Sequence, residues 1–297
     1  MNTYLIFRTD RIGDFLLSAI MINSIKRNDP NSHITVVSSK KNHDYIKSFN
    51  FINEVILLEN SLFNKIKVIC KLRSKYYDFI IVHDLKNRSS IISLLLKYKF
   101  RIKPNKNLDI SYIDSIKKIL LQLDFNFLIP DLNILNGRDF DYTNLLNDDY
   151  IVIHFDEKWI YKDYISEYTN IEPSQNDFIS FINLLLSTSN KKIVITTGID
   201  CPKILDNLFE NNFNQRIKIF KKLSFIDLEV IISKCELLIS CHGSVSHIAT
   251  AHNIKQIDII EENKSNFYLN WTKHFRNYFP LYRKKFSDLS NEIINLL

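Results

Sequence analysis

Glycine is the residue that this sequence most clearly lacks. Only four occur in 297 residues, where average usage would give about twenty. Gly13, Gly198 and Gly243 each follow an apolar run, and Gly137 lies mid-chain. A chain that otherwise avoids glycine keeps it where the backbone needs a positive φ or where a ligand must come close. Because ligands of open α/β sheets bind at the carboxyl ends of strands, the first three turns predict an active cleft.

Cysteine is scarce as well, and its spacing excludes the usual zinc sites. The four cysteines show no paired metal spacing, and no histidine cluster completes a ligand set. We therefore expect no metal, and reduced thiols in a cytoplasmic protein. The cysteines are Cys70, Cys201, Cys235 and Cys241.

Long apolar runs are also missing. No run approaches the ~20 residues that a membrane-spanning helix needs. The first eight residues are too short and too soon charged for a signal peptide. The sequence predicts a chain that is neither exported by this route nor integral to a membrane.

The charge balance is basic, with a formal net charge of +6. A basic excess suits an acidic partner such as a phosphorylated lipid or an anionic membrane surface. No concentrated basic block with interleaved aromatic residues is present, so we expect no nucleic-acid partner. The G-x-G-x-x-G and Walker patterns are absent too, which argues against a nicotinamide dehydrogenase or a P-loop enzyme.

What is present is an alternation of short apolar runs and helical patterns in residues 1–135. Such an alternation is typical of a parallel, doubly wound sheet. The predicted strands are Tyr4–Phe7, Ile34–Val37, Glu54–Leu58 and Phe79–Val82. The predicted helices are Asp14–Lys26, Asn42–Phe49, Leu62–Arg73, Ser89–Lys97 and Tyr112–Leu123.

The pattern breaks at residues 136–149, which are rich in Asn, Asp and turn formers and are predicted to be a linker. It restarts over 150–297, so we expect two Rossmann-like α/β domains that face a central cleft. The predicted strands are Tyr150–His154, Lys192–Thr196, Ile217–Phe220, Glu236–Ser240 and Gln256–Ile260. The predicted helices are Ser174–Leu186, Pro202–Glu210, Ser224–Ser233, Ser244–His252 and Leu289–Leu297.

The first glycine turn carries an acid at the start of the following helix. Asp14 follows Gly13 directly. An aspartate there is commonly a helix cap, worth about 1 kcal/mol. The alternative is a carboxylate at the cleft edge that takes a proton from an incoming hydroxyl.

Five segments carry a resemblance to a known family. They are Arg8–Leu17 with the pattern R-x-D-R-I-G-D-x-L-L, Tyr77–Leu85 followed by Arg88-Ser89, His154, Lys158-Trp159, and Leu223–His247. In this order they resemble glycosyltransferase family 9, the lipopolysaccharide heptosyltransferases. The resemblance is weak over 105–149 and after 262.

The resemblance implies a GT-B fold of two Rossmann-like domains. The acceptor would bind domain 1–135, and a nucleotide-sugar donor, ADP-heptose in the first instance, would bind domain 150–297 without a metal or another cofactor. In such inverting enzymes the acid that matches Asp14 is the general base, and a lysine that matches Lys158 neutralises donor phosphate.

Two further turns are candidate donor contacts. A helix that begins near Ser244 would point its N–H groups at a diphosphate, with His242 and His247 on either side. The alternative is an ordinary turn, in which the two histidines cap a helix or pack in the core. The expected donor-binding residues are Lys158, Thr196, Thr197, Gly198, His242, Gly243, Ser244 and His247.

The donor half departs from the family at two places. Where the family has Asp-[Ser/Thr]-Gly, this chain has His242-Gly243-Ser244. Ile226 stands where the family has an acid, with Asp227 next to it. Both changes concern the donor site, so the sugar and the nucleotide stay open.

For the acceptor, basic residues near the ends of first-half strands could hold phosphate or carboxylate groups. The alternative is that these residues are ordinary solvent-exposed charges at the rim of the domain. The expected acceptor-binding residues are Arg11, Gly13, Arg88, Arg101 and Lys103.

The sequence thus predicts a cytoplasmic glycosyltransferase that acts on an acidic glycolipid or polysaccharide precursor of the bacterial envelope, with peripheral contact to the inner membrane as part of the expectation. Two other classes stay open. One is a non-catalytic GT-B relative that binds a nucleotide or glycan. The other is a sugar-nucleotide epimerase on the same fold.

Overall fold

The computed structural model describes residues 1–104, 110–136, 138, 149–161, 163–205 and 215–297. The chain divides into two compact units, Met1–Ile134 and Leu135–Leu297. Each is an α/β unit built on its own sheet.

Unit 1 alternates strands and helices along the chain. Its elements are β1 (Thr3–Phe7), α1 (Ile12–Asn28), β2 (His33–Ser38), α2 (His43–Lys47), β3 (Glu54–Leu57), α3 (Leu62–Arg73), β4 (Tyr76–Val82), α4 (Asn87–Leu94), β5 (Lys97–Ile102), α5 (Tyr112–Gln122) and the short 3-10 helix η1 (Ile129–Leu132).

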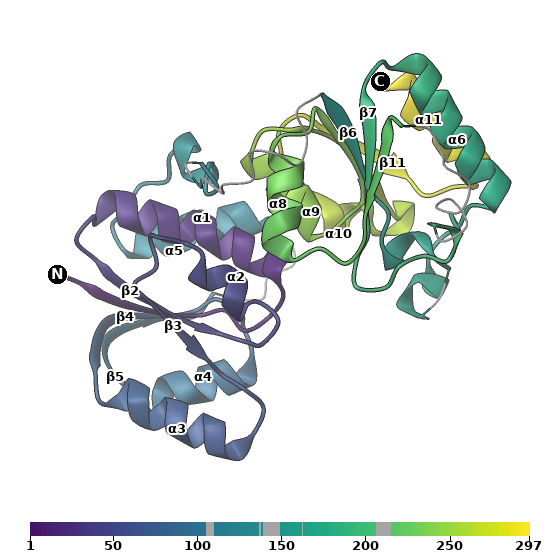
Figure 1. The fold of residues 1–297 in the computed structure, drawn as a ribbon. Coiled ribbons are helices and arrows are strands. Elements are labelled where there is room, and N and C mark those ends of the chain that lie inside the picture. Colours follow the sequence, from purple (N-terminus) through teal and green to yellow (C-terminus); the bar gives the residue numbers. More distant parts are fainter. Residues whose placement is uncertain (105–109, 137, 139–148, 162, 206–214) are drawn as a thin grey trace. The chain divides into compact units, whose positions relative to one another are not determined.

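The five strands of unit 1 form a parallel sheet in the order β3-β2-β1-β4-β5. α1, α2 and α5 cover one face, and α3 and α4 cover the other (Figure 1). β1 is central, and its residues Tyr4 to Phe7 are fully buried, as expected for a strand covered on both faces. All carboxyl ends of the parallel strands therefore lie at one edge.

Unit 2 restarts the same alternation. Its elements are β6 (Tyr150–His154), η2 (Glu157–Trp159), η3 (Asp163–Glu167), α6 (Gln175–Thr188), β7 (Lys192–Thr196), β8 (Ile217–Phe220), α8 (Phe225–Ser233), β9 (Leu237–Cys241), α9 (Ser244–Ala251), β10 (Lys255–Ile260), η4 (Glu262–Lys264), α10 (Ser265–Thr272), β11 (Tyr278–Tyr282) and α11 (Phe286–Asn295).

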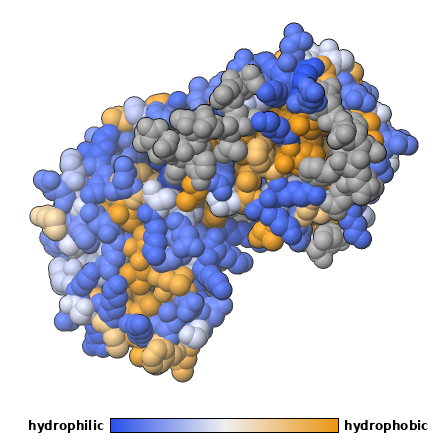
Figure 2. Space-filling view, viewed as in Figure 1, coloured by the Kyte–Doolittle hydropathy of each residue, from blue (hydrophilic) through white to orange (hydrophobic). Residues whose placement is uncertain are grey.

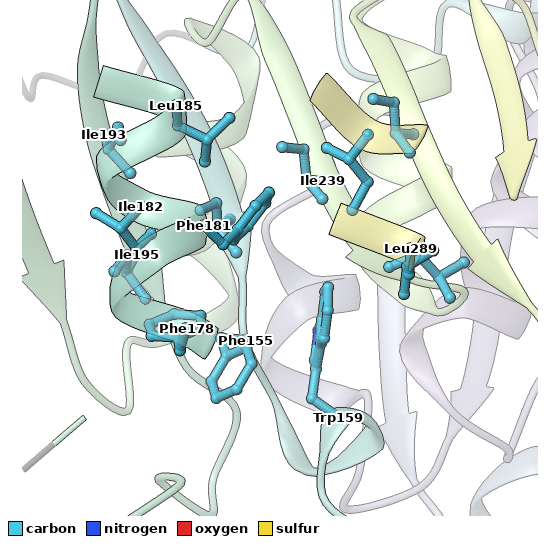
Figure 3. Close-up of a cluster of buried hydrophobic side chains, with 14 of the residues drawn as sticks. Phe155, Trp159, Phe178, Phe181, Ile182, Leu185, Ile193, Ile195, Ile239 and Leu289 are labelled. Carbon is cyan, nitrogen blue, oxygen red and sulfur yellow. The ribbon is translucent and has the colours of Figure 1, made fainter. Parts of the chain in front are cut away.

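The six strands of unit 2 are also parallel, in the order β11-β10-β9-β6-β7-β8. One face of this sheet packs on α6 and α11 through a cluster of aliphatic and aromatic side chains (Figure 3). Phe155 and Trp159, from the loop after β6, close this core beside Phe178 of α6. Burial of the loop's two aromatic rings fixes the backbone between them, which includes Lys158.

The α/β class and the parallel sheets confirm the sequence prediction, but three elements were missed. The helix predicted over Ser89–Lys97 ends at Leu94, and Lys97–Ile102 is strand β5. The last strand, β11, and the helix before it, α10, were not predicted. β5 and β11 are edge strands, half exposed and rich in polar or proline residues, so they lack the continuous apolar run of a central strand.

Parts of the prediction fall on residues outside the description. Of the linker 136–149, residues 137 and 139–148 lie outside it, and so do residues 206–210 of the helix predicted from Pro202. Within the described part of the chain, no helix is both long and apolar enough to cross a bilayer. All four cysteines are free.

Candidate functional site

In unit 1, the turns after β2, β1 and β4 are joined beyond the strand ends. The Arg8 N–H donates to the Val37 carbonyl at 2.9 Å, and the Asp84 N–H donates to the Phe7 carbonyl at 3.1 Å. The Asn42 side chain donates to the Arg8 carbonyl at 2.9 Å. These bonds gather the first glycine turn and the His83-Asp84 turn at the carboxyl edge.

A buried arginine organises the acids of this edge. The Arg8 guanidinium, 3% exposed, donates to the carbonyls of Asp14 at 2.8 Å and His83 at 2.7 Å. Nη1, which donates to His83, also lies 3.6 Å from the Asp10 carboxylate, and Nη2 lies 3.9 Å from the Asp14 carboxylate. The sequence analysis did not single out Arg8 or Asp10.

Asp14 is a helix cap whose carboxylate stays partly exposed. It is the third residue of α1, and its Oδ2 accepts the Arg11 N–H at 3.1 Å, so it caps the helix. Its side chain is nevertheless 21% exposed. Burial and the nearby Asp14 carboxylate raise the pKa of Tyr112, at the start of α5. The Asp14 carboxylate therefore lies 3.9 Å from a guanidinium and remains partly open to solvent.

Asp84 is the acid that holds the two turns together. Its carboxylate accepts hydrogen bonds from the Thr9 and Ser89 hydroxyls, both at 2.6 Å. The Lys86 N–H also donates to it at 3.1 Å. With its oxygens used in this way, Asp84 supports the site rather than offering a free base.

Asp10 is the acid that the site leaves least satisfied. Its Oδ1 is buried and has no hydrogen-bond partner among the described residues. Burial, with the Asp14 and Asp84 carboxylates nearby, raises the pKa of Asp10 to about 6. Arg8 offsets this increase only in part, and acids with a raised pKa are concentrated at functional sites.

We expect Asp10→Asn to stabilise the protein at pH 8. The folded pKa of Asp10 lies above its ordinary value, so this group favours folding below pH 4 and loses that contribution as pH rises to about 6. Removal of the charge should raise the free energy of unfolding by about 2 kcal/mol at pH 8 and flatten its pH dependence between pH 4 and 6. Urea unfolding at several pH values measures this, with the exposed Asp200→Asn as control. An unchanged pH dependence would contradict the prediction.

The expected acceptor residues are spread over three elements of unit 1. Arg11 and Gly13 lie in the turn that carries Asp14. Arg88, on α4, donates to the Asn60 side chain at 2.6 Å. Arg101, on β5, donates to the hydroxyls of two serines of α4, Ser93 at 2.8 Å and Ser90 at 2.7 Å, and Lys103 is exposed just after β5. The bonds of Arg101 tie β5 to α4, and the acceptor role of these residues stays a prediction.

In unit 2, a chain of polar contacts joins the ends of β6 and β7. His154 Nδ1 lies 2.9 Å from the Thr196 hydroxyl, and its Nε2 lies 3.4 Å from the Asp156 carboxylate. That carboxylate forms an ion pair with Lys158. Burial alone would raise the pKa of Asp156, but Lys158 and His154 hold it well below its usual range. Although burial opposes the charge on Lys158, Asp156 keeps the pKa of Lys158 above its ordinary value.

Gly243 lets Lys158 reach the first turn of α9. A Cβ at position 243 would lie 2.9 Å from Lys158 Nζ. The φ of Gly243 is −177°, which any residue adopts, so close approach accounts for the glycine. The amide groups at the start of α9 and the lysine ammonium thus lie together, and this combination attracts anions.

The third glycine turn packs on the same loop. A Cβ at Gly198 would lie 2.5 Å from Glu157 Oε2 and 3.2 Å from the Asp156 Cβ. The Thr197 hydroxyl accepts the Lys222 N–H at 3.0 Å. The residues predicted from separate strands, Lys158, Thr196–Gly198 and the 240–247 turn, are therefore neighbours at one edge of the sheet.

The acid missing from the 240–247 turn has a counterpart on the next strand. Asp258 of β10 is fully buried; its Oδ2 lies 2.6 Å from His242 Nδ1, and its Oδ1 accepts the Ser246 hydroxyl at 2.8 Å. Ser246 in turn accepts the Gly243 N–H at 3.2 Å. Asp258 fixes the ring of His242 and the entry to α9. A carboxylate inside the apolar strand Lys255–Ile260 was the signal that could have found it.

Residues from the end of the chain complete this site. His247 packs against the rings of Trp271, His274 and Phe275. Arg283, 6% exposed, donates to the Lys158 carbonyl at 3.0 Å. Trp271, His274, Phe275 and Arg283 follow position 262, after which the sequence resemblance is weak, and none of the four was predicted.

Two hollows are present in unit 2. One, of about 660 Å³, lies beyond the ends of β6, β7 and β8, and Phe155, Asp200, Lys221 and Lys222 are among its lining residues. The other, of about 720 Å³, lies at the opposite edge. Neither hollow is lined by a predicted site residue, but the first borders the loop of Lys158 through Phe155 and Ile160. In the part of the chain that the structure describes, no group of His, Cys, Asp or Glu side chains is arranged to hold a metal.

Solved structures share this fold over nearly the whole chain. E. coli heptosyltransferase WaaC with ADP has a TM-score of 0.74 at 13% identity, covering 99% of this chain and 98% of its own. The glycosyl transferase family 9 structure from Veillonella parvula DSM 2008 has a TM-score of 0.69 at 14% identity, covering 99% and 88%. The UDP-GlcNAc 2-epimerase from Methanocaldococcus jannaschii has a TM-score of 0.59 at 13% identity, covering 100% and 92%.

No protein-family model matches the chain, and no curated protein sequence is significantly similar to it. The structural likeness confirms the expected fold class, a GT-B-like pair of parallel α/β units. The resemblance to glycosyltransferase family 9 first seen in five sequence segments thus extends to the fold of nearly the whole chain.

Proposed function

We propose that the protein is an inverting glycosyltransferase that needs no metal and moves a heptose-like sugar from a nucleotide donor, with ADP-heptose as the first candidate. The acceptor is an acidic glycolipid of the lipopolysaccharide core or a capsule precursor. The proposal rests above all on the contact between Lys158 and Gly243 at the start of α9. This contact puts a cation and helix amides where a diphosphate can bind.

The donor diphosphate is bound by Lys158, by the first amides of α9 and by the Thr196–Gly198 turn. As the bond between the sugar and the diphosphate breaks, negative charge grows on the departing oxygen. Preorganised N–H groups and a cation stabilise this charge more than they stabilise the bound donor. Arg283 acts on this step through its hydrogen bond to the Lys158 carbonyl.

The acceptor is activated in unit 1. Asp14 accepts the proton of the attacking hydroxyl while the new bond to the anomeric carbon forms, which is general base catalysis. The Arg8 guanidinium lies 3.9 Å from this carboxylate, at the N-terminus of α1. Arg11, Gly13, Arg88, Arg101 and Lys103 contact the acceptor in this proposal. A single displacement of this kind inverts the anomeric configuration.

His242 distinguishes the proposed donor site from that of glycosyltransferase family 9. Glycosyltransferase family 9 has an acid at the matching position, whereas this chain has an imidazole anchored by Asp258. A hydrogen-bonding ring replaces a carboxylate beside the diphosphate, and the acid that Ile226 replaces is absent as well. Because both changes concern the donor half, other nucleotide sugars are compared with ADP-heptose.

A transfer assay tests the proposal. The protein is incubated with ADP-heptose, then with UDP-, GDP- and CMP-sugars, and with acidic glycolipid acceptors, in the presence of EDTA. We expect a new glycosidic bond with inverted configuration by NMR. Conversion of a UDP-sugar to its epimer without an acceptor would replace the proposal with the epimerase alternative. No reaction with any donor would favour a non-catalytic relative.

The proposed location is the cytoplasm, at the cytoplasmic face of the inner membrane, where nucleotide sugars and lipid-linked acceptors meet. The partners are the nucleotide-sugar donor and the acceptor, without nucleic acid.

A further inference from the structure

The outer face of the α3–α4 layer of unit 1 carries large apolar side chains in contact with solvent. Phe63 and Leu62 are 80% and 73% exposed. Figure 2 shows apolar surface, mixed with hydrophilic patches, over the part of unit 1 where α3 and α4 lie. Isolated exposed apolar residues are ordinary, but a cluster of this kind marks a binding surface. The cluster, here called the α3–α4 face, consists of Leu62, Phe63, Ile66, Ile91, Leu94 and Leu95.

The two helices of this face are held side by side. Val68 and Leu72 of α3 share one buried cluster with Ile92 of α4, so both helices pack on the same face of the sheet. At their first turns, Arg88 of α4 bonds to Asn60 just before α3, at 2.6 Å. The sides that face away from this shared core are the ones that carry the six apolar residues.

The same face is basic without any acid of its own. Residues 60–77 contain five Lys or Arg, residues 85–104 contain six, and neither segment contains Asp or Glu. Lys71 and Lys75 are neutralised by Glu54 of β3. Lys65, Lys67 and Arg73 are in none of the ion pairs formed among the described residues. Positive charge and exposed apolar side chains therefore alternate along α3.

We propose that the α3–α4 face binds the surface of an anionic lipid bilayer. Lysines and arginines are attracted to acidic headgroups, and the apolar side chains between them enter the boundary of the acyl chains. A nucleic acid would use the charges but not Phe63, Leu62 or Leu94. The proposal deepens the proposed function, because it supplies the surface on which a lipid-linked acceptor is presented.

Vesicle sedimentation tests the proposal with the full-length protein and no donor. We expect binding to phosphatidylcholine vesicles that contain about 30 mol% phosphatidylglycerol, and binding about tenfold weaker without the anionic lipid. Lys67→Glu with Arg73→Glu should lower the affinity for anionic vesicles about tenfold. Phe63→Ser with Leu94→Ser should lower it similarly, because the removed side chains are those that insert.

Matched controls lie on the opposite face of the same sheet. Leu121, 67% exposed on α5, and the neighbouring Lys118 provide Leu121→Ser and Lys118→Glu, which should leave vesicle binding unchanged. Equal losses in the control and test variants would overturn the proposal. So would a wild-type dimer that the Phe63→Ser and Leu94→Ser changes convert to monomer without any binding to vesicles.

The outcome is separable from that of the proposed function. Calorimetry with nucleoside diphosphates should give the same affinity in the vesicle-binding variants and the wild type, since these side chains belong to unit 1 and the proposed donor contacts to unit 2. If the protein bound vesicles but no nucleotide, the membrane-binding surface would be confirmed and the proposed function would be rejected.

Discussion

Asp14→Asn should lower the rate of sugar transfer by about 10³-fold while the affinity for the nucleotide donor stays unchanged, since a positioned general base contributes about 10² to 10⁴. Asparagine keeps an oxygen that can accept the Arg11 N–H, so the cap on α1 is retained. The donor contacts in this account all come from unit 2. Steady-state rates and calorimetric titration of the same variant separate the two effects.

Asp177→Asn is the matched control. Asp177 is also the third residue of a helix, α6, and is also part of an N-terminal cap, with Ser174. If the loss of rate came from a weakened cap, both variants would lose activity and stability alike. Turnover of Asp14→Asn within tenfold of the wild type would reject Asp14 as the base.

Lys158→Met should abolish measurable donor binding, and it should also destabilise unit 2. The Lys158 ammonium neutralises Asp156, which is 3% exposed. Removal of one partner of a buried pair commonly costs about 3–5 kcal/mol. A loss of donor affinity in this variant alone would therefore be ambiguous.

The double variant Asp156→Asn/Lys158→Met separates folding from binding. Asparagine retains the oxygen that accepts the Lys158 N–H, and no uncompensated charge remains, so most of the lost free energy of unfolding should return. Donor affinity should stay at least about 100-fold below the wild type, because the phosphate still lacks its cation. Lys284→Met, which breaks an exposed pair with Glu292, is the control. Donor binding that recovered with stability would show that Lys158 serves the fold alone.

The central strands and the glycine turns could be predicted because each follows from a local physical constraint. A parallel strand buried on both faces is a continuous apolar run, and β1, β6 and β9 are such runs. In a chain with four glycines, those after β7 and β9 lie where a Cβ would come within 3.0 Å of the Glu157 and Lys158 side chains. The edge strands of the sheets were harder to predict. β5 alternates basic and apolar residues directly after a helix, and β11 contains Pro280.

The partners of the site residues could not be read from the sequence. Lys158 and Asp156 are two residues apart, but Asp258 contacts His242 across sixteen positions, and Arg283 reaches Lys158 across 125. Such contacts depend on strand order, which places β10 beside β9. A charged residue within a buried strand was the available signal, since it must find a partner. Applied to Asp258, that rule would have predicted a polar partner for this strand residue.

The most direct test of the account is calorimetric titration of the purified protein with ADP, UDP, GDP and CMP in the presence of EDTA. We expect one nucleotide to bind in the micromolar range, with loss of binding in the double variant of Asp156 and Lys158. Binding of ADP would support an ADP-heptose donor. Binding of another nucleotide would support a glycosyltransferase with a different nucleotide-sugar donor. Absence of binding by all four nucleotides would contradict a donor site at the start of α9, and with it the proposed function.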